Sequence, residues 1–237
     1  MQLSFQYEDK TILFDVAYSR RKTIVISVET SGKVSVAAPE GISDDELLDR
    51  VKSKARWIIK KLCQIQDIQP VPKPKMFVSG ESFWYLGNKY SLKIIIDDMT
   101  IEPEVGICEG IFTVITPTPD PETLKQTIEA WYRSKAQEYI QERLPHYQTL
   151  LGVKPVRVKI KSQQKRWGSC SSLGNLNFNW RAVMAPSPVL DYLIVHELCH
   201  LVHHNHSRDF WQLVSSIIPD YKERRDWLKK NGGQLFI

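Results

Sequence analysis

The segment HELCHLVHHNH, residues 196–206, contains five of the six histidines of this chain. It continues the run VLDYLIV, which is apolar on nearly every side and predicts a helix buried in a core. Residues four apart are neighbours on one helix face, so His196 and His200 can direct both imidazoles at one point. Glu197 lies about a quarter of a turn further on, close enough to reach a water held there. This H-E-x-x-H arrangement predicts a zinc site with a carboxylate general base.

A catalytic zinc ion usually takes three protein ligands, so one more must come from further along the chain. His203 shares the helical face, but a rise of about 1.5 Å per residue would carry it away from the metal. Asn205 is tolerated in the left-handed conformation that ends helices, and Ser207 is a good N-cap for the next helix. The chain is therefore predicted to reverse between them, and His206, which lies in that reversal, is the predicted third ligand.

Several alternatives stay open at this point. Glu223 is the rival third ligand, although its basic neighbours Lys222, Arg224 and Arg225 favour an ordinary solvated helix face. His203 stands where the pattern H-E-x-x-H-x-x-G-x-x-H has its glycine, so the geometry of the turn is open. Cys199 is expected to fill the core rather than to bind metal. A structural zinc module without catalysis is disfavoured, because a base is present and three ligands converge.

The composition is that of a soluble globular protein. Hydrophobic residues make up 42% and charged residues 25% of the 237 residues, and the formal net charge is +5. The N-terminus lacks the basic start and apolar run of a secretory signal, and no apolar run approaches the ~20 residues that span a bilayer. The four cysteines form no C-x-x-C pair, so no zinc ribbon is expected. These features predict a cytoplasmic protein without a membrane segment.

The first half of the chain reads mostly as strands with one helix. Residues 23–39 predict a hairpin around Ser31-Gly32, and residues 43–66 predict a helix with a capping box. Three prolines break regular structure between residues 69 and 75. A second hairpin is expected to turn at Gly87-Asn88, and no internal repeat is recognisable.

The second half predicts a helix, then strands, then further helices. A long helix from residue 121 should end or kink at Pro145. Strands at 155–162 and 175–181 follow, with a turn at SSLG, before the histidine helix. Runs of one element type indicate an α+β fold. The predicted domains are a strand-rich N-terminal region, 1–117, and a catalytic domain, 118–237, with an active-site helix and a small antiparallel sheet.

The motifs RWGSC, NWR, HELCH and NHSRDFW, with SRRKTIVISVETSGKVSVAAP and ARWII upstream, resemble the YgjP-like metallopeptidase family, a relative of the SprT-like zincins. The resemblance spans most of the chain and implies a zincin-like, zinc-dependent metallopeptidase that acts on a peptide or protein. It also implies that the first two histidines, the glutamate and the histidine of NHS lie at the metal. In this sequence those residues are His196, His200, Glu197 and His206.

The resemblance gives a possible role to the segment RWGSCSSLGNLNFNW. In zincin-like folds a strand edge borders the cleft, and a peptide can add to it as an extra strand. Gly168 would allow close backbone approach, and Asn179 is expected to face away from the core. Arg166 is a weaker candidate for stabilising the transition state. The alternative is that this strand simply presents a solvated face.

A function of another class is association with nucleic acid, because SprT-like relatives act on proteins attached to DNA. The modest net charge and the absence of a cysteine zinc ribbon argue against it. Duplex binding that falls steeply with salt would support it. The basic candidates are Arg20, Arg21, Lys22, Arg157, Lys159, Lys161, Lys165 and Arg166.

Overall fold

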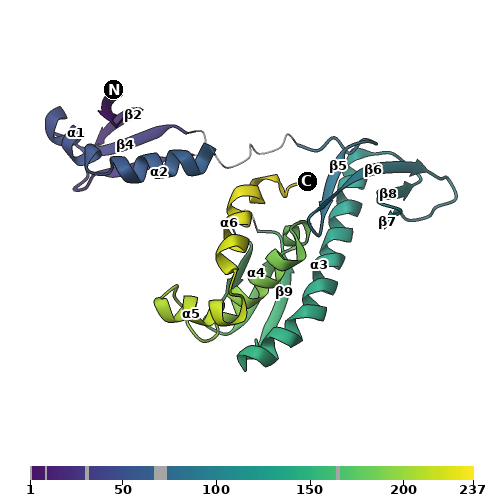
Figure 1. Cartoon of the computed structure of the whole chain (residues 1–237). Helices are drawn as coiled ribbons and strands as arrows, with labels where there is room; N and C mark the ends of the chain where they lie inside the picture. Colours follow the sequence, from purple (N-terminus) through teal and green to yellow (C-terminus); the bar gives the residue numbers. More distant parts are fainter. Residues whose placement is uncertain (1, 9, 30–31, 67–73, 164–165) are drawn as a thin grey trace. The chain divides into compact units, whose positions relative to one another are not determined.

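The structure is a computed structural model that describes residues 2–8, 10–29, 32–66, 74–163 and 166–237. The chain splits into two compact units, Met1–Gln69 and Pro70–Ile237. Within the described residues, six α-helices and three small sheets of mixed strand direction make an α+β fold, as the sequence predicts (Figure 1). Most of the proline segment 69–75, namely residues 69–73, lies outside the described residues.

The first unit is a four-stranded sheet with two helices. Its strand order is β1-β2-β4-β3, in which β2 and β4 are parallel and the other two pairs antiparallel. The predicted hairpin is confirmed as β3 paired with β4, although Ser31 of its turn is not among the described residues. The elements are β1 Gln2–Tyr7, β2 Lys10–Ser19, β3 Val25–Val28, β4 Val34–Pro39, α1 Asp44–Lys52 and α2 Ala55–Gln66.

The predicted helix over residues 43–66 is two helices, with a break at Ser53. The capping prediction holds at its start, where the Ser43 side chain accepts a hydrogen bond from the Glu46 amide at 3.3 Å. At the break the Ser53 hydroxyl donates to the Arg50 carbonyl at 2.7 Å. A serine hydroxyl that bonds the backbone in this way competes with the helix ladder, and the apolar spacing alone did not reveal it.

The second unit begins with a sheet of the same topology as the first. Its order is β5-β6-β8-β7, with β6 and β8 parallel and the outer pairs antiparallel, and it is followed by a helix, α3. The expectation of no internal repeat was therefore wrong. The repeat preserves buried positions more than residue identity, which hides it from sequence comparison. The elements are β5 Ser82–Tyr85, β6 Asn88–Ile96, β7 Glu104–Cys108, β8 Ile111–Thr116 and α3 Pro121–Leu151. The buried pairs at a constant offset are Phe5 and Phe83, Phe14 and Leu92, Val34 and Phe112, and Val36 and Val114.

The hairpin of β5 and β6 is tied to the segment that leads into the histidine helix. The amides of Leu86 and Gly87 donate to the carbonyls of Val183 and Met184 at 2.9 and 3.1 Å. The turn is Leu86-Gly87, one residue earlier than predicted, and both residues have positive φ. The functional division predicted at residues 117 and 118 thus runs through one compact unit, and it stays a prediction.

The helix α3 is longer than predicted, because it continues through Pro145 to Leu151. A proline inside a helix removes one backbone hydrogen bond, but here Leu144 and Tyr147 on either side of it are buried. Burial of these two side chains holds the helix together. It ends at Gly152, whose φ of 64° is the left-handed conformation common at helix ends.

The remaining elements form the part of the unit that contains the histidines. In Figure 1, α3 runs beside α4 and β9. The predicted antiparallel sheet is a mixed one of order β10-β11-β9: the second strand of the β10–β11 hairpin lies next to β9 and parallel to it, which leaves β10 at the edge. The elements are β9 Arg157–Lys161, β10 Gly168–Cys170, β11 Asn175–Asn179, η1 Trp180–Met184, α4 Ser187–Cys199, α5 Arg208–Ile217, α6 Tyr221–Asn231 and η2 Gly232–Gln234.

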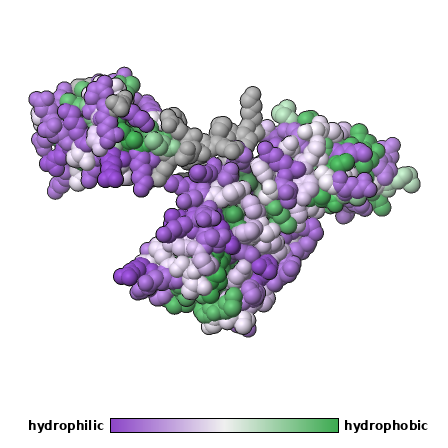
Figure 2. Space-filling view, in the orientation of Figure 1, coloured by the Kyte–Doolittle hydropathy of each residue, from purple (hydrophilic) through white to green (hydrophobic). Residues whose placement is uncertain are grey.

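The visible surface is largely hydrophilic, as Figure 2 shows. Exposed apolar side chains of the second unit include Met99 and Ile101 after β6, and Val156 and Leu173 beside the β10–β11 turn. Among the described residues, no helix combines the length and the apolar character that crossing a membrane requires.

Candidate metal centre

The structure brings the three predicted ligands together. One potential ligand atom from each of His196, His200 and His206 lies within 4.8 Å of the others, and we call these residues the three-histidine group. The Nε2 atoms of His196 and His206 are 3.1 Å apart. Glu223, the rival ligand, is exposed in the first turn of α6 and is not part of the group.

The chain turns after α4 and brings His206 back beside His196 and His200, but the turn differs in part from the predicted one. The helix α4 ends at Cys199, so His203 is not carried along a continuing helix. Asn205 is not left-handed; its side-chain oxygen instead accepts the Ser207 amide at 3.3 Å. The predicted N-cap is present, because the Ser207 hydroxyl accepts the Phe210 amide at 3.3 Å.

His203 contributes through its backbone. Its carbonyl oxygen lies 3.0 Å from Nδ1 of His200, and its own amide donates to the Cys199 carbonyl. A hydrogen bond at Nδ1 fixes the tautomer of an imidazole and directs Nε2 toward the metal position. The tight turn that was in doubt, where His203 replaces a glycine, therefore orients His200.

Aromatic side chains contact all three imidazoles. The Tyr192 hydroxyl lies 3.4 Å from Nδ1 of His196. The Phe210 ring stacks on His200 with centroids 4.6 Å apart, and the Trp211 ring stacks on His206 at 5.5 Å. Because these rings are fixed by the packing of α4 and α5, the three-histidine group is preorganised rather than dependent on side-chain motion.

Burial also sets the charge of two of these histidines. It lowers the pKa of His196 to about 3, with further lowering by the neighbouring His200, His206 and Arg225. Burial lowers the pKa of His200 as well. Neutral imidazoles offer lone pairs to a metal ion, so at neutral pH these two side chains are in the form that coordination requires.

Glu197 lies beside the group with its carboxylate almost fully buried, at 4% exposure. Burial raises its pKa to about 8, against an opposing effect of the Arg166 charge. Its Oε2 atom is buried and has no hydrogen-bond partner among the residues that the structure describes. A buried carboxylate oxygen without a partner is costly, and it is the feature expected of a group that handles a proton in the functional state.

The edge strand β10 passes directly over this carboxylate. A Cβ atom placed on Gly168 would lie 2.5 Å from Oε1 of Glu197, closer than real atoms approach. The sequence singled out Gly168 for close backbone approach, and the partner it approaches is Glu197. Any side chain at this position would have to displace the Glu197 carboxylate or the strand, so glycine favours the close approach seen here.

This contact gives a first testable prediction. We expect Gly168→Ala to lower the free energy of unfolding by about 1–3 kcal/mol, because the added methyl group overpacks a buried contact. Gly106→Ala, in the strand β7, is the matched control, since a Cβ there meets nothing within 4 Å. Urea denaturation of both variants measures the difference. Equal stability of the two would show that Glu197 moves aside freely.

Asn179 is placed differently from the expectation. It is buried, its side-chain amide donates to the carbonyls of Gln163 and Arg166 at 2.7 and 3.1 Å, and its oxygen accepts the Arg181 amide. With these bonds made, Asn179 holds the backbone of Gln163 and Arg166 from a buried position. Arg166 is exposed and lines a cavity over the three-histidine group.

Of the described basic residues considered for nucleic acid, Arg166 lines a cavity at the three-histidine group. Arg157, Lys159 and Lys161 are exposed along β9, and Lys22 lines a cavity in the first unit. Lys165 is outside the part of the chain that the structure describes. Neither the β9 residues nor Lys22 line the cavities at the three-histidine group, so nucleic-acid binding stays a hypothesis.

An ion pair between a buried carboxylate and a partly exposed arginine joins α4 to α3. The Asp191 carboxylate accepts from Nε of Arg143 at 3.0 Å and from its terminal nitrogen at 2.8 Å, and the Tyr139 hydroxyl donates to it at 3.1 Å. Asp191 is one of the few charged residues in the core, and it lies on the helix that carries His196. This pair therefore fixes the position of the active helix.

Removing the cation of this pair should destabilise the protein. We expect Arg143→Ala to lower the free energy of unfolding by about 1–3 kcal/mol, because Asp191 would stay buried without its charged partner. Lys125→Ala, which breaks the exposed pair with Glu122 on the same helix, should cost less than about 0.5 kcal/mol. Similar losses measured for both variants by denaturation would contradict a special role for the Arg143–Asp191 pair.

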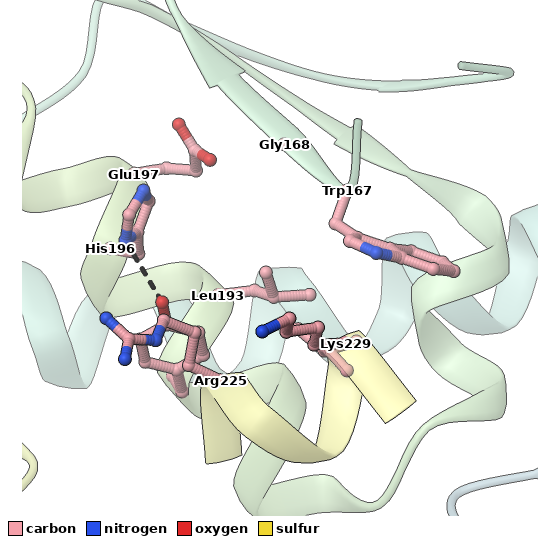
Figure 3. A pocket seen from close by; sticks show the side chains of 9 residues that line it. Trp167, Gly168, Leu193, His196, Glu197, Arg225 and Lys229 are labelled. Carbon is pink, nitrogen blue, oxygen red and sulfur yellow. Dashed lines mark hydrogen bonds between the residues drawn. The ribbon is translucent and has the colours of Figure 1, made fainter. Parts of the chain in front are cut away.

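Two cavities flank Glu197. One, of about 380 Å³, lies over the three-histidine group and is lined by polar residues including Arg166 and Ser169. The other, of about 310 Å³, we call the side cavity. It shares the wall of Gly168, His196 and Glu197, and its other lining residues are Trp167, Tyr192, Leu193, Arg225, Leu228 and Lys229. Figure 3 shows Glu197 and Trp167 on opposite sides of the side cavity, with Leu193, Arg225 and Lys229 below them.

The sequence reasoning missed the contribution of α6 to this site. Arg225 is exposed, as the interpretation of a solvated face expects, but its guanidinium also lies 5.2 Å from the centre of the Trp211 ring and lines the side cavity. The available signal was its spacing from Leu228 and Lys229, which places all three near one face of a helix. Charge alone did not distinguish that face from solvent.

Comparison with known proteins identifies a family. Residues 22–231 match the family model described as YgjP-like, metallopeptidase domain. Among solved structures, the chain is similar to the metallopeptidase zymogen abylysin of Pyrococcus abyssi, at 22% sequence identity and a TM-score of 0.38. That similarity covers 41% of this chain and 99% of the other, and at this level it transfers no residue role. No curated protein matches this chain.

Proposed function

Because the chain belongs to the YgjP-like metallopeptidase family, we propose that it is a zinc-dependent peptidase that uses Glu197 as general base. The family is one of metallopeptidases, so a metal ion and a peptide bond belong to its chemistry. The observation that carries the proposal is the convergence of three imidazoles beside a buried carboxylate whose Oε2 atom has no hydrogen-bond partner among the described residues. A metal ion with a purely structural role would not need a carboxylate beside its ligands.

The residues present fit a zinc ion. His196, His200 and His206 would hold it, since three nitrogen ligands with a free fourth position are typical of catalytic zinc. When bound, zinc polarises the scissile carbonyl and lowers the pKa of water at that position. The hydrogen bond between His200 and the His203 carbonyl supports this assignment, because metal-binding imidazoles usually donate their other ring nitrogen in this way.

Glu197 takes the proton of the attacking water and later delivers a proton to the leaving amine. Within the described parts of the chain its Oε2 atom has no hydrogen-bond partner, so it is able to hold that proton. Its raised pKa suits a group that must both accept and donate a proton near neutral pH. Gly168 supplies backbone close to the same carboxylate. We infer that the edge strand β10 aligns a peptide across the cleft by strand addition, as in zincin-like folds.

Arg166 is the candidate for stabilising the developing negative charge. It is exposed and lines the cavity over the three-histidine group, so its guanidinium is available to a bound substrate. Asn179 acts indirectly in this proposal, by holding the backbone of Arg166 through its side-chain amide.

The test combines metal analysis with peptide cleavage. The intact chain is expected to bind close to one zinc ion, to cleave members of a peptide library, and to lose and regain cleavage when zinc is removed by a chelator and restored. A protein that binds zinc but cleaves no peptide under any of these conditions would overturn the peptidase function and leave a structural metal site.

A further inference from the structure

The side cavity has an apolar floor next to the reacting groups. Leu193 and Leu228 are buried at 6% and 7% exposure. Trp167 is held in place by the close approach of Gly232, where an added Cβ would lie 2.9 Å from the indole ring. A fixed ring and two leucines make a rigid apolar wall that favours the burial of an apolar or aromatic stem.

The rim of the same cavity is positively charged. Arg225 and Lys229 are four residues apart on α6, so they lie on one face of that helix. The carboxylate nearest to Arg225 is Asp226, whose Oδ1 is 3.8 Å from Nε, a distance too long for a hydrogen bond. Among the described residues, no carboxylate lies within 4.0 Å of the Lys229 amine. The two cations are thus available to a bound anion.

The cavity adjoins the reacting groups. His196 and Glu197 line both the side cavity and the cavity over the three-histidine group, and Gly168 of the edge strand lines both as well. A peptide aligned on β10 would therefore place one of its side chains, or its end, in the side cavity. The volume of about 310 Å³ equals the liquid volume of on the order of ten waters, which suits one amino-acid side chain.

From these observations we propose that the side cavity is the specificity subsite, and that it selects a substrate residue whose apolar stem ends in a carboxylate. The inference rests on the proposed peptidase function. The stem lies against Trp167, Leu193 and Leu228, and the carboxylate pairs with Arg225 and Lys229. A basic side chain is repelled by the two cations. The carboxylate belongs either to an acidic side chain or to the C-terminus of the peptide.

The test uses matched peptides and the zinc-loaded full-length chain. The two peptides of the first pair differ at one position, which is Glu in one and its neutral isostere Gln in the other. The two peptides of the second pair differ only at the C-terminus, which is free in one and amidated in the other. We expect kcat/KM to favour the carboxylate member of one pair by about fivefold to tenfold, and this preference to shrink at high salt. Preference in the first pair identifies a side-chain carboxylate, and in the second pair a terminal one.

The variants connect this preference to the cavity. Arg225→Gln combined with Lys229→Gln should abolish it, and Arg225→Glu combined with Lys229→Glu should reverse it toward Lys-containing peptides. Lys222→Gln combined with Lys230→Gln changes the charge of α6 equally, but neither residue lines the cavity, so the preference should persist. Zinc content should be unchanged in all of these proteins.

A binding measurement separates this inference from the proposed function. Fluorescence anisotropy with labelled versions of the same peptides, on zinc-loaded Glu197→Gln, reports selection without requiring cleavage. If no peptide is cleaved by the wild type but carboxylate peptides still bind about fivefold better, the peptidase function fails and the subsite stands. Equal affinity within both pairs, or a preference that survives the Arg225→Gln and Lys229→Gln changes, overturns the subsite.

Discussion

Glu197→Gln is expected to reduce peptide hydrolysis by roughly 100- to 10,000-fold, because the amide cannot take a proton from the attacking water. Zinc content should remain near the wild-type value, since the three-histidine group does not include Glu197. The substitution is isosteric, so the contact with Gly168 is preserved. Cleavage kinetics and metal analysis on the same preparation measure both quantities. Cleavage at the wild-type rate would exclude Glu197 as the base.

The stability of this variant provides a control that is independent of activity. The pKa of Glu197 is raised by burial from 4.5 to about 8, so between these pH values the folded metal-free protein holds a proton that the unfolded chain releases. Folding stability of the metal-free wild type should therefore fall as pH rises across that window. A glutamine side chain does not titrate, so the Glu197→Gln variant should lack this contribution, as thermal unfolding at several pH values would reveal.

His206→Ala is expected to weaken zinc binding by at least about 100-fold, because it leaves two protein ligands for an ion that usually has three. The loss should appear as metal dissociation at chelator concentrations that the wild type withstands. Since His206 is exposed and lies between helices, the fold of the variant should be retained. Titration with a competing chelator measures the affinity, and circular dichroism checks the fold.

Two further substitutions complete this comparison. His203→Ala removes an imidazole three residues away but keeps the backbone carbonyl that bonds His200, so zinc affinity should hardly change. Glu223→Ala tests the rival ligand and should also leave zinc binding intact, because Glu223 lies outside the three-histidine group. Loss of zinc in Glu223→Ala together with its retention in His206→Ala would reverse the assignment.

The centre of the site could be predicted from the sequence because its residues are close along the chain. His196, Glu197 and His200 lie within five residues, and helix geometry alone places the imidazoles together. His206 was predicted from the turn signals around it. One of these signals acts differently in the structure: Asn205 is not left-handed, and its side chain accepts a hydrogen bond instead. Local rules sufficed here since each depends on neighbouring residues.

What surrounds the centre was decided by contacts between distant segments. Gly168 closes over Glu197 because β10 is the edge of a mixed sheet, an order that no strand pattern specifies. Arg225 lines the side cavity because α6 packs against α4, where its charge had indicated only solvent.

For the two four-stranded sheets, too, the sequence predicted one part and the structure revealed another. Alternating residues predict one hairpin of each sheet, β3–β4 and β5–β6, because alternation directly reflects one buried face. Their strand orders, β1-β2-β4-β3 and β5-β6-β8-β7, became visible only in the tertiary structure. Thus the sequence by itself determined the grouping of the three histidines with the carboxylate of Glu197, through the periodicity of one helix and its turn. The tertiary structure decided that Gly168 lies against the Glu197 carboxylate and that Arg225 and Lys229 line the side cavity. These positions depend on packing between residues that are far apart in the chain.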